Sequence, residues 1–176
     1  GEATLRVGRK RFELFLMPGG KLEVTINLPE IFWSESHLFG KKENGQLIWF
    51  EGTYAALNTE LVKHAGLMNI YSADNFYENI CGVTPVQYKK YVTKIYEKNR
   101  GEILKNKSLS DAARTYMINK LEMSYFFAIR GYKGNISYAP MISGKKGVKR
   151  ADMTVDESYY DDILELDFIH SPYIRY

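Results

Sequence analysis

The chain has 176 residues, of which 45% are hydrophobic and 14% aromatic, which is enough for a hydrophobic core and too much for a disordered chain. It carries 24 Lys and Arg against 21 Asp and Glu, a formal net charge of +3. The single cysteine excludes an intramolecular disulfide and a cysteine-built metal site, and we expect a reducing, cytoplasmic compartment. No apolar run approaches the roughly 18 residues of a membrane-spanning helix, so we expect no membrane partner. The first residue is Gly rather than Met, and we expect the chain to be a piece of a longer protein.

The first half of the chain favours β-structure. Apolar and polar residues alternate over 3–16 and again over 22–28, with a Pro-Gly-Gly turn between them, which predicts an antiparallel hairpin. Residues 46–50 predict another short strand. Asn58 is expected to cap a short helix up to residue 65, and two more short strands are expected over 68–72 and 76–80.

The second half favours helices. Thr84, Pro85 and Gln87 form a capping-box pattern that predicts a helix to about Asn99, and a second helix is expected from Ser108 to about residue 129. Residues 131–147 are rich in Gly, Ser and Lys and predict a hairpin or loop, and residues 163–169 predict a last strand. The fold class expected is therefore α+β, with an N-terminal antiparallel hairpin, two long helices and a C-terminal β element.

The charge is distributed unevenly, and it suggests three regions. Residues 1–81 are expected to be a mostly β subdomain. Residues 82–150 carry 15 Lys and Arg against 4 Asp and Glu, a net charge of +11, and form a basic helical subdomain. Residues 151–176 carry 1 and 7, a net charge of −6, and form an acidic tail. The basic region also holds nine Tyr or Phe, a composition typical of a nucleic-acid groove; the alternative is a solvated basic helix face above core tyrosines.

The order of motifs in residues 44–100 adds a resemblance. Gly52-Thr53 follows an apolar strand, Thr59-Glu60-Leu61 follows on a helix, and Tyr88, Tyr91-Val92 and Ile95-Tyr96 lie along the capped helix. This order resembles the segment before the fingers helix of protein-primed family B DNA polymerases of phages and linear plasmids. In that family the next helix carries a Lys-x-x-x-Asn-Ser-x-Tyr-Gly motif. Here Arg114 and Asn119 stand in that helix with a spacing of five rather than four, and the Ser, Tyr and Gly are missing.

The resemblance implies a fingers-like fragment that grips template-primer DNA during DNA replication and is joined to the rest of a larger polymerase chain. It implies nucleotide-binding roles for Arg114, Asn119 and Lys120. No cofactor is expected in the chain itself, although a complete polymerase would use Mg²⁺. Stacking on a base or sugar is expected from Tyr91 or Tyr125. The cations expected to contact DNA phosphates are Lys90, Lys94, Lys98, Lys105, Lys107, Lys145, Lys146, Lys149 and Arg150.

Catalytic carboxylates are weakly indicated. Asp161 and Asp162 resemble the paired-Asp turn of polymerases but lie in a polar stretch, and Asp167 ends an apolar one. A strand through this region would place Asp161 and Asp167 on one face at about 20 Å, too far apart to share a metal. The chain alone is therefore not expected to polymerise DNA.

Two other functions fit the sequence. A non-enzymatic phage or plasmid accessory protein could use the basic region to bind its own acidic tail or an acidic partner. A diverged adenine DNA methyltransferase fragment is the second alternative, because Ser171-Pro172-Tyr173 resembles the Ser/Asn/Asp-Pro-Pro-Tyr loop of those enzymes, with one proline missing.

Overall fold

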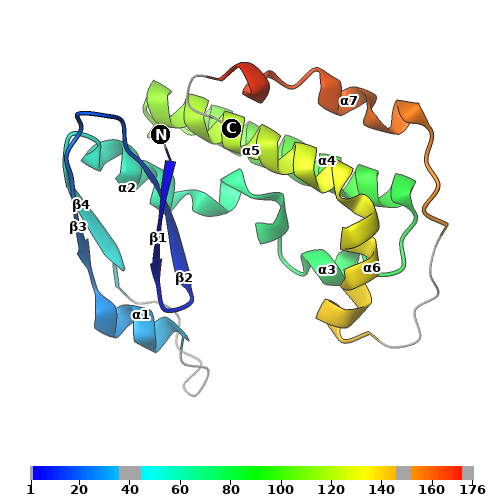
Figure 1. Cartoon of the computed structure of the whole chain (residues 1–176), viewed down its shortest axis with the longest axis horizontal. Coiled ribbons are helices and arrows are strands. Elements are labelled where there is room, and N and C mark those ends of the chain that lie inside the picture. The colour runs from blue at the N-terminus through cyan, green and yellow to red at the C-terminus, as the bar shows by residue number, and fades with distance from the viewer. Residues whose placement is uncertain (1, 36–44, 146–151, 172–176) are drawn as a thin grey trace. The chain divides into compact units, whose positions relative to one another are not determined.

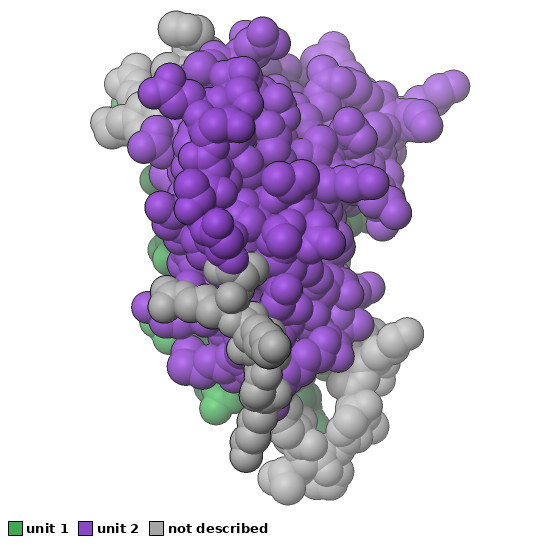
Figure 2. Space-filling model, turned by 90° about the vertical axis from the view of Figure 1, so that its right-hand side faces the viewer, with its two compact units in different colours: residues 1–64, 175 green, residues 65–174, 176 purple. Residues whose placement is uncertain are grey.

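The computed structural model describes residues 2–35, 45–145 and 152–171 (Figure 1). It divides the chain into two compact units, unit 1 up to His64 and unit 2 from Ala65 onward, which Figure 2 shows in different colours. The fold is α+β, as the sequence predicted. None of the helices in the described ranges has the length and apolar character needed to cross a bilayer.

The described part of unit 1 contains two separate antiparallel strand pairs. β1 (Glu2–Val7) pairs with β2 (Lys10–Phe15), and β3 (Leu22–Ile26) pairs with β4 (Ile48–Gly52). An N-terminal antiparallel hairpin is present, but it forms between β1 and β2 and turns at Gly8, which has φ 59°. The predicted pairing of residues 3–16 with residues 22–28 across the Pro-Gly-Gly turn is wrong. The strand predicted over 3–16 is thus a hairpin in itself, and the next strand pairs with β4.

The described residues of unit 1 also contain two helices, α1 (Leu28–Glu35) and α2 (Ala55–Lys63). The core is formed by Phe12, Leu14, Ile31 and Ile48, which come from β2, α1 and β4. β2 buries Phe12 and Leu14 on this side, and β3 half-buries alternate residues, as the sequence pattern predicts. Asn58 does not cap a helix, because it lies inside α2.

Unit 2 is built around two long helices, α4 (Pro85–Lys105) and α5 (Asp111–Arg130). The capping box predicted for α4 is confirmed: the Thr84 hydroxyl accepts from the Gln87 N–H, and the Gln87 side chain accepts from the Thr84 N–H. α5 begins at the cap Ser110 rather than at Ser108. It is the central helix of the unit, since it packs against α4 and against the shorter elements η1 (Ala65–Met68), η2 (Ile70–Ser72) and α6 (Tyr132–Ser143).

Several predicted strands are helical. Residues 68–72 contain parts of η1 and η2, and α3 (Phe76–Asn79) replaces the strand expected over 76–80. The expected hairpin or loop after Gly131 is α6, which ends at Gly144 with φ 71°. Short apolar runs do not distinguish a buried helical turn from a strand, and here contacts with α5 and α6 decide. Residues 65–81 consequently belong to unit 2, whereas composition placed the boundary after residue 81.

The tail folds back onto the helices of unit 2. Residues 152–171, here called the acidic strap, contain η3 (Glu157–Tyr160), α7 (Asp161–Leu164) and η4 (Asp167–His170), coloured orange to red in Figure 1. The C-terminal strand predicted over 163–169 is therefore wrong. No strand lies in the described part of unit 2 to pair with it, and the segment forms its hydrogen bonds in local turns instead.

Candidate nucleic-acid interface

Four lysines form a row along the solvent face of α4. Lys90, Lys94, Lys98 and Lys105, here called the lysine row, are all exposed. At 3.6 residues per turn, their spacing keeps them within about 80° of one another around the helix. The buried residues of α4 lie on the opposite face: Pro85, Tyr88, Val92, Asn99 and Ile103. The row is thus held in place by a helix whose other face belongs to the core.

The length of the row suits a polyanion. From Lys90 to Lys105 the helix rises about 22 Å at 1.5 Å per residue. One DNA strand carries a phosphate about every 3.4 Å along the axis, so the row can face several phosphates. Within the described residues, the row's ion pair is Lys98 with Glu102 at 3.8 Å, an exposed pair of small energetic weight. Lys107, in the loop after α4, is also exposed.

The two candidate stacking tyrosines have different surroundings. Tyr125 is 2% exposed, its ring stacks on that of Tyr96 with centroids 4.6 Å apart, and its hydroxyl shares a 2.9 Å hydrogen bond with Thr93. It is therefore a core residue and no platform for a base. Tyr91 is half-buried at the side of the row, and its hydroxyl accepts from Asn79 at 3.0 Å.

Other tyrosines of the basic region also lie in the core. This is what the alternative interpretation, a solvated basic helix face above core tyrosines, predicted. Tyr88, Tyr116 and Tyr132 are at most 2% exposed. Burial raises the pKa of Tyr88, so its hydroxyl stays protonated and donates to the Ala128 carbonyl at 3.0 Å. These tyrosines are therefore unavailable to a base, whereas Phe127 and Tyr138, outside the row, are exposed.

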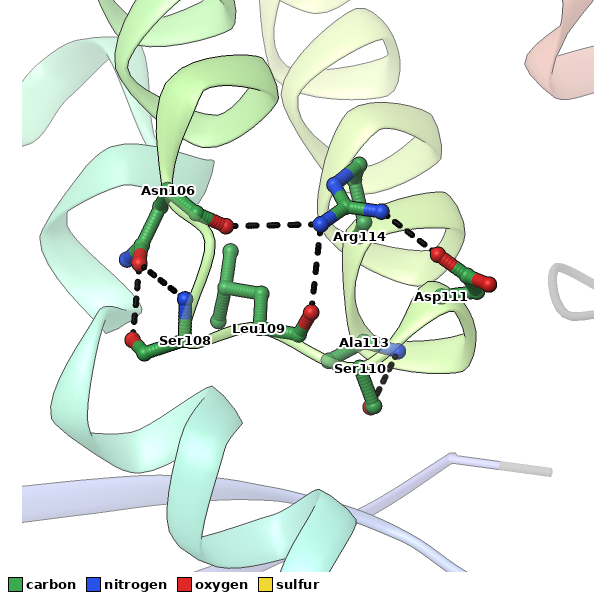
Figure 3. Close-up of polar contacts among 7 residues, drawn as sticks. All are labelled: Asn106, Ser108, Leu109, Ser110, Asp111, Ala113 and Arg114. Carbon is green, nitrogen blue, oxygen red and sulfur yellow. Dashed lines mark hydrogen bonds and ion pairs between the residues drawn. The ribbon is translucent and has the colours of Figure 1, made fainter.

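Arg114 ties together the loop between α4 and α5 (Figure 3). Its Nη1 pairs with Asp111 at 2.6 Å, and its Nη2 donates to the carbonyls of Asn106 at 3.3 Å and Leu109 at 3.1 Å. Asn106 in turn accepts from the N–H and hydroxyl of Ser108. The guanidinium thus organises this loop through Nη1 and Nη2, while its Nε is buried without a hydrogen-bond partner among the described residues.

The other two predicted nucleotide ligands are buried in α5. Asn119 is 7% exposed and donates to the Ser171 hydroxyl at 2.5 Å, and Lys120 is 8% exposed. The structure does not bring them to the surface with Arg114. Ser171, the first residue of the methyltransferase-like tripeptide, is part of this strap contact, and residues 172 and 173 lie outside the described residues.

The carboxylates weakly indicated for catalysis are on the strap. Asp162 pairs with Lys89 at 2.9 Å, and Asp161 and Asp167 are exposed. In the ranges that the structure describes, no three His, Cys, Asp or Glu side chains are grouped so that they could hold a metal ion. Asp161, Asp162 and Asp167 therefore do not form a shared metal site in the described structure.

The strap is attached to α4 through Lys89 and to α6 through Tyr132. The Lys89 ammonium donates to the Tyr159 carbonyl at 2.9 Å and also reaches Asp162. The Tyr159 hydroxyl donates to the Pro85 carbonyl at 3.2 Å, and the Tyr132 hydroxyl donates to the Met153 carbonyl at 2.6 Å. Sequence patterns gave no sign of Lys89, because each of its partners is distant along the chain.

Glu122 attaches the strap to α5. It is 7% exposed, and its carboxylate accepts backbone N–H groups of Phe168 and Asp167. Burial raises the pKa of Glu122, and the nearby charge of Asp167 raises it further. One of its oxygens, Oε2, is buried without a hydrogen-bond partner. This acidic residue was not singled out from the sequence, since a lone Glu inside a long helix is ordinarily solvated.

One more predicted DNA contact, Lys145, is described, and it lies outside the row. Lys145, after α6, donates to the Glu78 carbonyl at 3.2 Å and lies 3.8 Å from its carboxylate. Lys146, Lys149 and Arg150 lie outside the described residues.

No protein-family model, curated protein or solved structure matches the chain. The family B resemblance therefore depends on the sequence motifs alone.

Proposed function

We propose that the chain binds DNA through the lysine row of α4 and does not itself catalyse a reaction on it. The observation that supports this proposal is the row itself, which places four exposed ammonium groups along one face of a helix. Lys90, Lys94 and Lys105 form no ion pair with any described residue, so their charge is available to an anionic partner. DNA binding also implies a compartment that contains DNA, in keeping with the cytoplasmic location expected from the sequence.

The family resemblance supports a more specific role within this proposal. The row would grip template-primer DNA as part of a larger family B-like polymerase, whose remaining residues would hold Mg²⁺ and the nucleotide. The proposal gives no nucleotide-binding role to Arg114, Asn119 or Lys120. The Arg114 side chain is bonded to the loop between α4 and α5, and the other two side chains are buried. Purified chain should then show no primer extension with Mg²⁺ and nucleotides.

The salt dependence of binding is the sharpest test. A protein that neutralises four phosphates releases counterions, and log K should fall with log salt at a slope of about −3.6. Fluorescence anisotropy with a labelled primer-template duplex at about 30 to 200 mM salt measures this slope. The variant in which all four row lysines are replaced by Gln should lose most of the slope and bind at least about tenfold more weakly at the lowest salt.

The matched control removes four exposed cations from unit 1. Arg6, Arg11, Lys21 and Lys63 are exposed, and their replacement by Gln changes the net charge by the same amount. It should reduce affinity far less than the row variant does. Equal losses in both variants would mean that net charge rather than the row governs binding. A wild-type chain that fails to bind at the lowest salt would contradict the proposal and favour the accessory-protein alternative.

A further inference from the structure

We propose that the acidic strap is an electrostatic barrier that weakens DNA binding and confines DNA to the lysine row. This inference depends on the proposed function, because it concerns regulation of the same site. The strap contributes its charge without covering the row. Its effect on DNA is therefore repulsion through solvent and not competition for the same lysines.

The strap separates its apolar and acidic residues. Tyr159, Ile163 and Phe168 are buried against unit 2, and the Phe168 ring lies 5.4 Å from that of Phe126. All the acidic residues of the strap are exposed, and the strap contains no Lys or Arg. These residues are Asp152, Asp156, Glu157, Asp161, Asp162, Glu165 and Asp167. The strap therefore gives unit 2 a fixed acidic surface.

The strap lies to one side of the row on α4. Its attachment point, Lys89, is about 100° around the helix from Lys90 and about 140° from Lys94. Because a helix with its side chains is about 10 to 12 Å across, the strap carboxylates near Lys89 are too far from the row to pair with it. They are close enough to act on a phosphate backbone seated there, since the screening length is about 10 Å at 0.1 M salt and longer in more dilute salt.

The negative charge of the strap is comparable in size with the positive charge of the row. The row supplies four positive charges, and the strap has seven carboxylates, of which Asp162 is paired with Lys89. The remaining six face solvent and lose no charge to a described ion pair. DNA bound to the row therefore lies near an acidic surface. A duplex that moves from the row toward Lys89 meets stronger repulsion from the strap carboxylates. This repulsion should weaken steeply as salt is added.

Three strap carboxylates can be neutralised without touching the attachment of the strap. Glu157, Asp161 and Glu165 are exposed and are not among the residues that bond to α4, α5 or α6. The triple variant Glu157→Gln, Asp161→Asn, Glu165→Gln should bind duplex DNA about three- to tenfold more tightly at 30 mM salt and less than about twofold more tightly at 300 mM. Its thermal unfolding should match that of wild type, which shows that the strap stays folded.

The control makes the same charge change elsewhere. Glu23, Glu51 and Asp74 are exposed residues outside the strap, and their replacement by the matching amides also removes three negative charges. A gain confined to the strap variant and to low salt supports the barrier. Equal affinities of the strap and control variants overturn it and leave the proposed function intact. A gain that persists unchanged at 300 mM also overturns it, and an absence of binding by every protein removes both proposals.

Discussion

The Asn58 side chain in α2 bonds to both backbone polar groups of Phe15 at the end of β2. Its Oδ1 accepts the Phe15 N–H at 2.7 Å, and its Nδ2 donates to the Phe15 carbonyl at 2.9 Å. Asn58 is fully buried, and its Nδ2 also donates to the Tyr54 carbonyl at 2.8 Å. The amide therefore satisfies a strand end and fixes α2 against β2 in unit 1.

Replacing Asn58 by Leu should destabilise the protein strongly. The side chain keeps four heavy atoms, but the buried N–H and carbonyl of Phe15 lose their bonds to the amide, at a cost of about 2 to 4 kcal/mol in the free energy of unfolding. Urea unfolding measures the loss. The neighbouring variant Thr59→Ala removes an exposed hydroxyl bonded to the Ala55 carbonyl and should change stability by less than about 0.5 kcal/mol. A similar small effect for Asn58→Leu would contradict this account.

Arg114 should matter for stability rather than for ligand binding. Arg114→Gln removes the bonds that join the carbonyls of Asn106 and Leu109, and we expect the free energy of unfolding to fall by about 1 to 2 kcal/mol. DNA affinity, measured by anisotropy, should stay within about twofold of wild type. Lys133→Gln, at an exposed position of α6 outside the predicted DNA contacts, is the control for loss of a charge. A large loss of nucleotide or DNA affinity without loss of stability would restore a binding role for Arg114.

The parts of the fold that the sequence predicted are those encoded by neighbouring residues. The Thr84–Gln87 capping box requires a spacing of three residues only, and the strands of unit 1 alternate within themselves. The spacing of Lys90, Lys94 and Lys98 is equally local, since helical periodicity alone places them together. Lys105 joins them only because α4 continues past the predicted end at Asn99. For these features the pattern and the tertiary structure agree.

The parts that were missed depend on residues far apart in the chain. Asn58 looks like a helix cap because Phe15, the residue it binds, is not adjacent to it in sequence. The apolar residues of the strap suggested a strand, but their partners are the helices of unit 2. Likewise, Tyr125 looks like a stacking residue until Tyr96 is seen against it. Tertiary packing overrides local preference at each of these positions.

Gly101 should be replaceable by Ala with a gain in stability. It lies inside α4, where Gly is about 0.5 to 1 kcal/mol less favourable than Ala, and a Cβ there would meet no heavy atom within 4 Å. Thermal unfolding should therefore shift upward by about 1 to 4 °C. Gly131→Ala is the contrasting variant, because its Cβ would lie 2.9 Å from the Phe127 carbonyl, and it should lower stability. A loss of stability in Gly101→Ala would mean that α4 needs a glycine at this point.

Glu122 should make stability depend on pH in a direction set by its burial. Its surroundings are Tyr96 and Arg100 of α4 and Asp167 and Phe168 of η4, and burial raises its pKa above the ordinary value of 4.5. The folded state then holds the proton more tightly than the unfolded state does. The stability linked to this proton is fully present below pH 4.5 and is lost as the pH rises through the higher pKa of the folded state.

The variant Glu122→Gln isolates this effect, because it is neutral at every pH and keeps an oxygen that can accept the backbone N–H groups of η4. We expect the free energy of unfolding of the variant, minus that of wild type, to increase from pH 4 to pH 7.5, since only wild type must ionise a buried group. Urea unfolding at closely spaced pH values measures it. Glu97→Gln, at an exposed position of α4, corrects for the change in net charge. If the difference for Glu122→Gln were constant or fell with pH, the carboxylate would be stabilised where it lies, and the attachment of the strap would gain from its charge.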